Sequence, residues 1–205
     1  MLPTLADNKK CTGCLACIDS CRNNALTFST HKDGHIYVSV NPNNCVGCKA
    51  CERVCPIISK LPYRNSKYSI FHAAWNKDMN LRKNSASGGV FSAIASYILD
   101  TGGIVFGSAI ENVSEIKHIY IENKKELSKL QGSKYAYSIT VNCYKQAYEF
   151  LKNNRTVLFS GTGCQIAGLL SFLKNKTYKG KLITIDLICG GVPSRLLIDT
   201  FIKEE

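Results

Sequence analysis

The chain is poor in acidic residues, in tryptophan and in long apolar runs. Its 15 Asp and Glu face 26 Lys and Arg, and the resulting formal charge of +11 favours acidic proteins or anionic cofactors as partners. Apolar runs such as Ile104-Val105-Phe106 are far shorter than the roughly 20 residues of a membrane-spanning helix, so no span is expected. No basic stretch is interleaved with aromatic residues, which argues against nucleic-acid binding. The single tryptophan, Trp75, is expected in the core.

Cysteine, by contrast, is abundant. Eight of the 11 cysteines form two copies of the spacing C-x2-C-x2-C-x3-C, which is typical of proteins that bind two [4Fe–4S] clusters. In two-cluster ferredoxins each run supplies three ligands to one cluster and its last cysteine to the other. The predicted ligand sets are Cys11, Cys14, Cys17 and Cys55 for one cluster, and Cys45, Cys48, Cys51 and Cys21 for the second.

Two other uses of these cysteines remain open. A disulfide scaffold suits a short secreted chain, but Met1–Ala6 is too short to hold the apolar core of a signal peptide ahead of Cys11. Structural zinc sites use two C-x2-C pairs at a wider separation, so triplets with a fourth cysteine fit zinc poorly. Reduced cysteines without an export signal predict a cytoplasmic protein.

The position of the cysteine runs predicts two domains. We expect an α+β ferredoxin-like two-cluster module over residues 1–58, with a hairpin turn at Asp33-Gly34, and a linker over 59–69. Strands then alternate with helices, which predicts an α/β domain with a mixed or mostly parallel sheet over 70–205. The expected strands are 26–29, 35–40, 70–75, 104–110, 117–122, 156–159 and 181–189, with helices over 90–99, 141–151 and 166–173 and from 194.

Two turns rich in serine and glycine precede predicted helices, at 85–89 and 160–165. Free N–H groups at a helix N-terminus bind phosphate, so these turns suit the phosphate of a flavin cofactor. A flavin is apt here because it couples one-electron transfer from clusters to two-electron chemistry on a substrate. Neither turn is a dinucleotide-binding or Walker motif, so tight turns and helix caps are the competing interpretation. Cys164, just inside a predicted helix, and Cys189, at a strand end, are candidate catalytic or flavin-contacting residues, or small buried ones.

Four motifs behind the cysteine runs point to a family: S-A-S-G-G at 85–89, G-S-K-Y at 132–135, S-G-T-G-C-Q at 160–165 and C-G-G-V-P-S at 189–194. With them the chain resembles the coenzyme F420 hydrogenase/dehydrogenase beta-subunit family. The resemblance implies an iron–sulfur flavoprotein oxidoreductase whose α/β domain holds FAD and exchanges hydride with F420 or another small-molecule substrate. The flavin-binding residues it implies are Ser85, Ser87, Gly88, Gly89, Lys134, Ser160, Gly161, Thr162 and Gln165. Family members usually exceed 205 residues, so the second domain is expected to be C-terminally short.

Two further functions remain as alternatives. The chain could be an electron-carrier or docking subunit that has clusters but no flavin chemistry, working with a redox partner protein such as a ferredoxin-like carrier or a catalytic subunit. It could also be a zinc-stabilised binding module. Iron, acid-labile sulfide, zinc and flavin contents distinguish the three functions.

Overall fold

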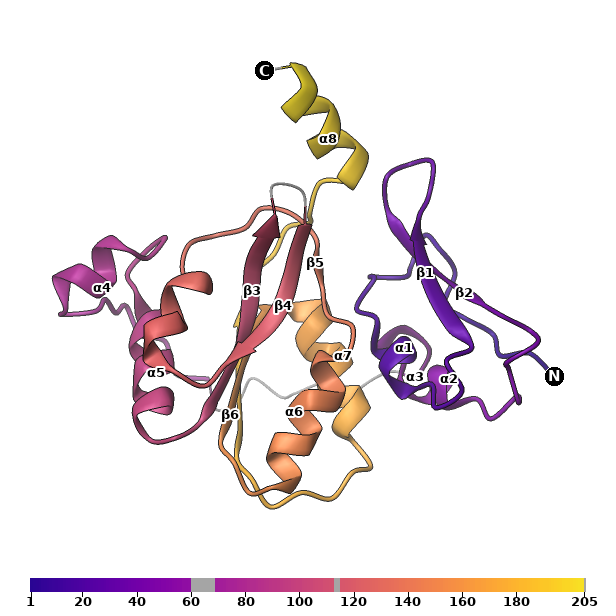
Figure 1. Cartoon of the computed structure of the whole chain (residues 1–205), viewed down its shortest axis with the longest axis horizontal. Coiled ribbons are helices and arrows are strands. Elements are labelled where there is room, and N and C mark those ends of the chain that lie inside the picture. Colours follow the sequence, from indigo (N-terminus) through magenta and orange to yellow (C-terminus); the bar gives the residue numbers. More distant parts are fainter. Residues whose placement is uncertain (60–68, 113–114, 205) are drawn as a thin grey trace.

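The computed structural model describes residues 1–59, 69–112 and 115–204 and has two parts that lie side by side (Figure 1). A cysteine-rich N-terminal module packs against one flank of an α/β unit built on a five-stranded sheet. The predicted fold class is confirmed. Residues 60–68, most of the predicted linker at 59–69, lie outside the described part of the chain. None of the described helices has the length and apolarity needed to cross a bilayer.

The N-terminal module repeats one local conformation around each cysteine run. Gly13 and Gly47 have φ of 68° and 69°, and Leu15 and Lys49, which precede the two matching helices, have φ of 59° and 57°. A left-handed conformation costs a residue with a Cβ roughly 1–2 kcal/mol, so its recurrence at matching positions shows that both runs fold into the same loop. The elements are α1 (Ala16–Ser20), β1 (Leu26–Thr30), β2 (Ile36–Val40), α2 (Ala50–Val54) and α3 (Pro56–Ser59).

The predicted hairpin is confirmed between α1 and α2. Strands β1 and β2 pair antiparallel, from Leu26 opposite Val40 to Thr30 opposite Ile36. Asp33 shapes the turn, because its Oδ1 accepts the N–H of His35 at 2.9 Å.

The sheet of the α/β unit has the strand order β5-β4-β3-β6-β7. β3 pairs antiparallel with β4, whereas the β3–β6, β6–β7 and β4–β5 pairs are parallel, so the sheet is mixed and mostly parallel. Its strands are β3 (Ile104–Asn112), β4 (Glu115–Ile121), β5 (Ser138–Ile139), β6 (Val157–Thr162) and β7 (Leu182–Leu187). The accompanying helices are α4 (Met79–Lys83), α5 (Val90–Asp100), the 3-10 helix η2 (Lys124–Lys129), α6 (Cys143–Lys152), α7 (Gly163–Leu173) and α8 (Arg195–Glu204).

Alternation along the central strand β6 divides the core between two faces. Val157 and Phe159 pack toward α6 and α7, together with Cys14 and Ala16 of the module. Leu158 packs on the opposite face, against α5 and the residues around η2. Burial of each such side chain stabilises the fold by roughly 1.5–3 kcal/mol. The N-terminal module contributes residues to the first of these two cores.

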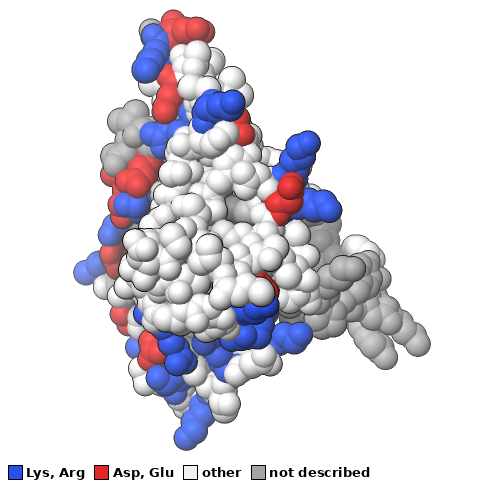
Figure 2. Space-filling model, turned by 90° about the vertical axis from the view of Figure 1, so that its right-hand side faces the viewer, with Lys and Arg blue, Asp and Glu red and all other residues white. Residues whose placement is uncertain are grey.

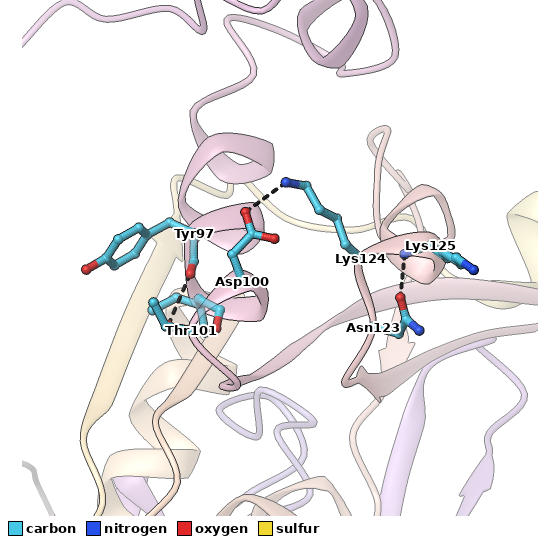
Figure 3. Close-up of polar contacts among 7 residues, drawn as sticks. Tyr97, Asp100, Thr101, Asn123, Lys124 and Lys125 are labelled. Carbon is cyan, nitrogen blue, oxygen red and sulfur yellow. Dashed lines mark hydrogen bonds and ion pairs between the residues drawn. The ribbon is translucent and has the colours of Figure 1, made fainter.

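Figure 3 shows how η2 is joined to α5 on the second face. Lys124 Nζ lies 2.8 Å from Asp100 Oδ2, and Asn123 Oδ1 accepts the N–H of Lys125 at the start of η2. Both charges are about half exposed, so the ion pair contributes at most about 1 kcal/mol. Apolar packing therefore dominates this contact.

The predicted strand at 70–75 and the predicted core position of Trp75 are wrong. No strand is assigned over residues 69–78, and Phe71 and Trp75 are 92% and 64% exposed. The segment instead lies beside the turn that precedes α5, because the N–H of Asn76 donates to the carbonyl of Gly88 at 2.6 Å. An apolar run alone predicts a strand, but pairing also needs a neighbouring strand edge, which this segment does not reach.

Candidate functional site

The structure brings together the side chains of Cys11, Cys14, Cys17 and Cys55, the first predicted ligand set. The pKa of Cys17 is raised to about 12, first by burial and then by the charges of Cys14, Cys11 and Cys55. Burial also raises the pKa of Cys14 to about 11, with contributions from Cys55, Cys164 and Cys11. Buried thiolates that repel one another need positive charge between them to ionise, and iron ions supply such charge. The donor chemistry of this set therefore fits a cluster.

The second predicted set lines a cavity of about 640 Å³. Cys45, Cys48 and Cys51 contribute to the wall together with Cys21, the last cysteine of the first run. Burial raises the pKa of Cys51, with smaller contributions from charges that include Cys21. Cys48 is exposed, so this set lies closer to solvent than the first. Over the residues that the structure describes, no three Cys, His, Asp or Glu side chains are placed to hold a single metal ion.

The first set is bound to the α/β unit through the backbone of its loop. The carbonyl of Cys14 accepts a hydrogen bond from Tyr144 Oη at 2.8 Å, and the hydroxyl of Tyr137 donates to the carbonyl of Gly13. Helix α7 approaches from another side, since a Cβ added at Gly168 would lie 3.1 Å from Cys14 Sγ. A glycine at 168 therefore permits direct contact between α7 and the first cysteine set.

Asp19, between the last two cysteines of the first run, joins the module to α6. Its carboxylate accepts the N–H groups of Asn142 at 2.7 Å, Tyr144 at 3.0 Å and Lys145 at 3.4 Å. Burial raises the pKa of Asp19, while these hydrogen bonds and the charge of Lys145 oppose the rise. A side chain of the module thus caps a helix of the α/β unit, in place of a local cap.

His118 on β4 links the turn at 160–165 to strand β5. Its Nε2 lies 3.0 Å from the carbonyl of Ser160, and its Nδ1 lies 2.7 Å from Ser138 Oγ. Burial lowers the pKa of His118 to about 4, although the hydrogen bond to Ser160 opposes this. The ring is therefore neutral at neutral pH, and since the carbonyl accepts only, Nε2 carries the proton and Nδ1 accepts from Ser138.

The serine–glycine turn at 160–165, the second of the two, serves partly as a helix cap. Thr162 and Gln165 form a capping box at the start of α7, with the N–H of Thr162 donating to Gln165 Oε1 at 3.0 Å. A Cβ at Gly161 would lie 3.0 Å from the same Oε1. A Cβ at Gly163 would lie 3.3 Å from Asp186 Oδ1, so a carboxylate already lies beside this helix N-terminus. That negative charge disfavours a phosphate at this terminus.

The first serine–glycine turn leads into α5, whose N-cap is Gly89 with φ 75°. Ser85 Oγ lies 2.8 Å from Ser92 Oγ, and Gln131 Nε2 donates to Ser92 Oγ at 3.1 Å. Lys134 Nζ in turn donates to the carbonyl of Gln131 at 2.7 Å. This chain of hydrogen bonds brings Lys134, whose pKa burial lowers, to the N-terminal end of α5.

Both turns lie at the same edge of the sheet, the carboxyl end of the parallel strands β3 and β6, on opposite faces (Figure 1). Open α/β sheets bind ligands at this edge. Ser87 and Gly88 lie there, directly before Gly89, and so does Cys164, the second residue of α7. Cys189 does not join them within a defined element: it is exposed beyond β7, and its Sγ accepts the N–H of Gly191 at 3.3 Å.

Two cysteine-lined loops packed against helices α6 and α7 are the arrangement expected of an iron–sulfur module beside an α/β domain. Residues 10–57 match the family model of a 4Fe-4S dicluster domain. Residues 71–144 and 154–205 match the N-terminal and C-terminal models of the coenzyme F420 hydrogenase/dehydrogenase beta subunit. The chain belongs to the coenzyme F420 hydrogenase/dehydrogenase beta-subunit family, as its motifs predicted.

The chain is similar to a curated ferredoxin and to a solved hydrogenase structure. Ferredoxin-3 from a Nostoc species is 33% identical over 64 residues, which span 24% of this chain and 66% of that protein. A solved structure of the F420-reducing [NiFe] hydrogenase complex from Methanosarcina barkeri aligns with a TM-score of 0.53 at 18% identity. The alignment covers 63% of this chain and 47% of that chain, so the chain spans about half of the hydrogenase component. This likeness shows a shared fold.

Some residues of the site carry little or no sequence signal. Tyr137 and Tyr144 lie more than 120 positions from the carbonyls to which they donate, so no local pattern points to them. Asp19 has a weak signal, an acidic residue in the C-x3-C gap, where a metal ligand is not expected. Asp186 follows a run of β-branched residues at the end of β7, a position typical of ligand-contacting side chains in α/β sheets.

Proposed function

We propose that the chain is an iron–sulfur flavoprotein oxidoreductase, or the electron-transfer subunit of one, that connects two [4Fe–4S] clusters with FAD. The substrate is proposed to be a small molecule that exchanges hydride with the flavin, with coenzyme F420 as one candidate. Family membership and the match to a dicluster domain support the proposal. Because free cysteines and iron–sulfur chemistry belong to a reducing compartment, we place the protein in the cytoplasm.

The observation that carries the proposal is the contact of the first cysteine set with α7. Cys14 lies against Gly168, and Cys164, at the start of the same helix, contributes to the electrostatic surroundings of Cys14. The first set therefore adjoins the sheet edge where both serine–glycine turns lie. Tyr137 and Tyr144 hold the loop in place and, being largely buried, exclude water from this contact.

In this proposal Cys11, Cys14, Cys17 and Cys55 hold one cluster, and Cys45, Cys48, Cys51 and Cys21 hold the other. When bound, the clusters supply one-electron transfer and the flavin couples it to two-electron chemistry. The chain's own part is to place the first set against the flavin edge and to leave the second set toward solvent.

The charges at the sheet edge indicate how a flavin dinucleotide would be oriented. Lys134 and the N-terminus of α5 offer positive charge and suit the phosphate groups, together with Ser85 and Ser87. At the N-terminus of α7, Asp186 beside Gly163 suits hydroxyl groups, which donate to a carboxylate. Ser160, Gly161, Thr162 and Gln165 shape this second end through their backbone, since the Gln165 amide is used internally.

Anaerobic purification with quantified iron, acid-labile sulfide and flavin tests the proposal. We expect both clusters and FAD, and we expect Lys134→Met to lower the flavin content while iron is retained. Lys125→Met, an exposed lysine on η2, is the matched control and should leave both contents unchanged. An iron-loaded protein that binds no FAD would defeat the flavin part.

A second candidate function is an electron-carrier or docking subunit without flavin chemistry. The side chains of Ser85 and Gln165 favour this function, because they already form hydrogen bonds within the protein and are less available to a flavin. The exposed apolar segment with Phe71 and Trp75 also suits a partner protein. This function predicts clusters without flavin and a partner subunit that co-purifies.

A further inference from the structure

A groove beside the second cysteine set collects positive charge. One wall comes from the cysteine loops and α2, and the other from α6 and the end of α7. Seen from the side of the module, basic side chains gather on the lower part of the molecule, below an uncharged area (Figure 2). The groove, which we call the basic groove, is lined by Arg22, Lys49, Arg53, Lys145, Lys174 and Lys176.

The carboxylates of the chain offset only part of this charge. Across residues 1–59, 69–112 and 115–204, none of the six cations forms an ion pair with a carboxylate. The acidic residues of the lining are Asp19, buried against α6, and Glu149, which pairs with Lys152 at 3.1 Å. Six cations face these two carboxylates, and an oxidised [4Fe–4S] cluster held by four thiolates would add about −2, so the basic groove keeps a net positive charge.

One of the cations, Lys176, lies over two aromatic rings and is close enough to Arg22 to feel its charge. Lys176 Nζ lies 4.5 Å from the ring centroid of Phe172 and 4.9 Å from that of Tyr148. Burial, and then the charge of Arg22, lowers the pKa of Lys176, while the charge of Glu149 opposes this change. Glu149 offsets only part of the repulsion between Lys176 and Arg22, so an anionic partner that approaches both cations is stabilised by them.

We propose that the basic groove is the docking site of an acidic one-electron carrier protein that exchanges electrons with the cluster held by the second cysteine set. The inference rests on the proposed relay, since the groove wall contains that set and its Cys48 is exposed. The first set is turned toward α7 instead, so a docked carrier meets the second set first. One electron leaves the carrier and enters the cluster, or the reverse, and no bond forms or breaks.

Binding of a defined acidic carrier tests the docking site. Oxidised flavodoxin, an acidic one-electron carrier, is titrated calorimetrically into the anaerobic cluster-loaded protein. We expect Lys174→Glu with Lys176→Glu to weaken binding about tenfold or more at low ionic strength, with little difference near 1 M salt. The matched control is Lys83→Glu with Lys125→Glu, which changes the net charge equally on the other face of the sheet and should alter binding by less than about twofold. Equal weakening in both double variants, or none in the groove variant, overturns the proposal.

Three further measurements complete the test. Lys174→Glu alone affects an exposed side chain and should still weaken binding, which guards against misfolding caused by the change at Lys176. The rate at which reduced flavodoxin is oxidised should fall in parallel, with unchanged iron content. Neither readout requires FAD, so a missing flavin defeats the proposed function while leaving the docking result standing. If inorganic pyrophosphate binds the groove and flavodoxin does not, the site takes small anions and the proposal is wrong.

Discussion

Acid should destabilise this protein through His118. Burial lowers the pKa of His118 from 6.5 to about 4, so between these values the folded state binds fewer protons than the unfolded chain. The contribution of neutral His118 to the free energy of unfolding is therefore fully present above pH 6.5 and is lost as the pH falls toward 4. Between pH 7.5 and pH 5 the two pKa values give a loss of about 2 kcal/mol. At roughly 2–4 °C for each kcal/mol, the melting temperature should fall by about 4–8 °C from this residue alone.

Thermal unfolding followed by circular dichroism under anaerobic conditions measures the effect. The melting temperature of His118→Gln should be lower than that of the wild type at pH 7.5, because the contacts with Ser138 and Ser160 change. Since the variant has no titrating group at this position, its melting temperature should fall less between pH 7.5 and pH 5. His35→Gln, an exposed histidine in the hairpin, is the control and should keep the wild-type profile. A His118→Gln variant that loses as many degrees as the wild type between pH 7.5 and pH 5 would refute the reasoning.

Three other predictions concern the module and its contact with the α/β unit. Asp19→Ala should lower stability by about 2–4 kcal/mol, because three N–H groups at α6 lose a buried acceptor, whereas Asp19→Asn should retain part of the stability; equal melting of all three proteins would contradict this. Gly168→Val should cost about 1–3 kcal/mol and reduce iron loading of the first set, with Gly190→Ala, which has open space around it, as the unchanged control. Cys55→Ala and Cys21→Ala should each lose one cluster, but different ones, which electron paramagnetic resonance of the reduced variants can distinguish; loss of the same signal in both would show that the ligand sets are misassigned.

The elements with strong periodic or turn signals were predictable from sequence. The apolar stripe of α5, the strands β3, β6 and β7, and the hairpin turn at Asp33-Gly34 all lie where the pattern places them, within a few residues. Short elements were not. β5 has two residues and exists through its pairing with β4, and α4 depends on a local cap, Asp78 Oδ1 with the N–H of Asn80 at 2.9 Å. The aspartate followed by helix-forming residues was a usable signal for α4.

The candidate site was predictable where it depends on covalent spacing. The cysteine runs predict which thiols come together, because the spacing itself limits the geometry. The contact of Cys14 with Tyr144 and Gly168 depends on packing between residues far apart in the chain, which periodicity does not encode. Similarly, the sequence suggests phosphate-binding sites at the N-termini of both α5 and α7. In the structure the carboxylate of Asp186 lies beside Gly163 and disfavours a phosphate at α7, which the sequence does not show.

The cap that Asp19 provides ties cofactor insertion to the maturation of the whole polypeptide. Because α6 is completed by a residue flanked by two cysteines, any order that iron brings to that loop is passed on to the helix, and the coupling is reciprocal. A chain without the cluster should then have a less stable α6, although this helix contributes none of the predicted cluster ligands.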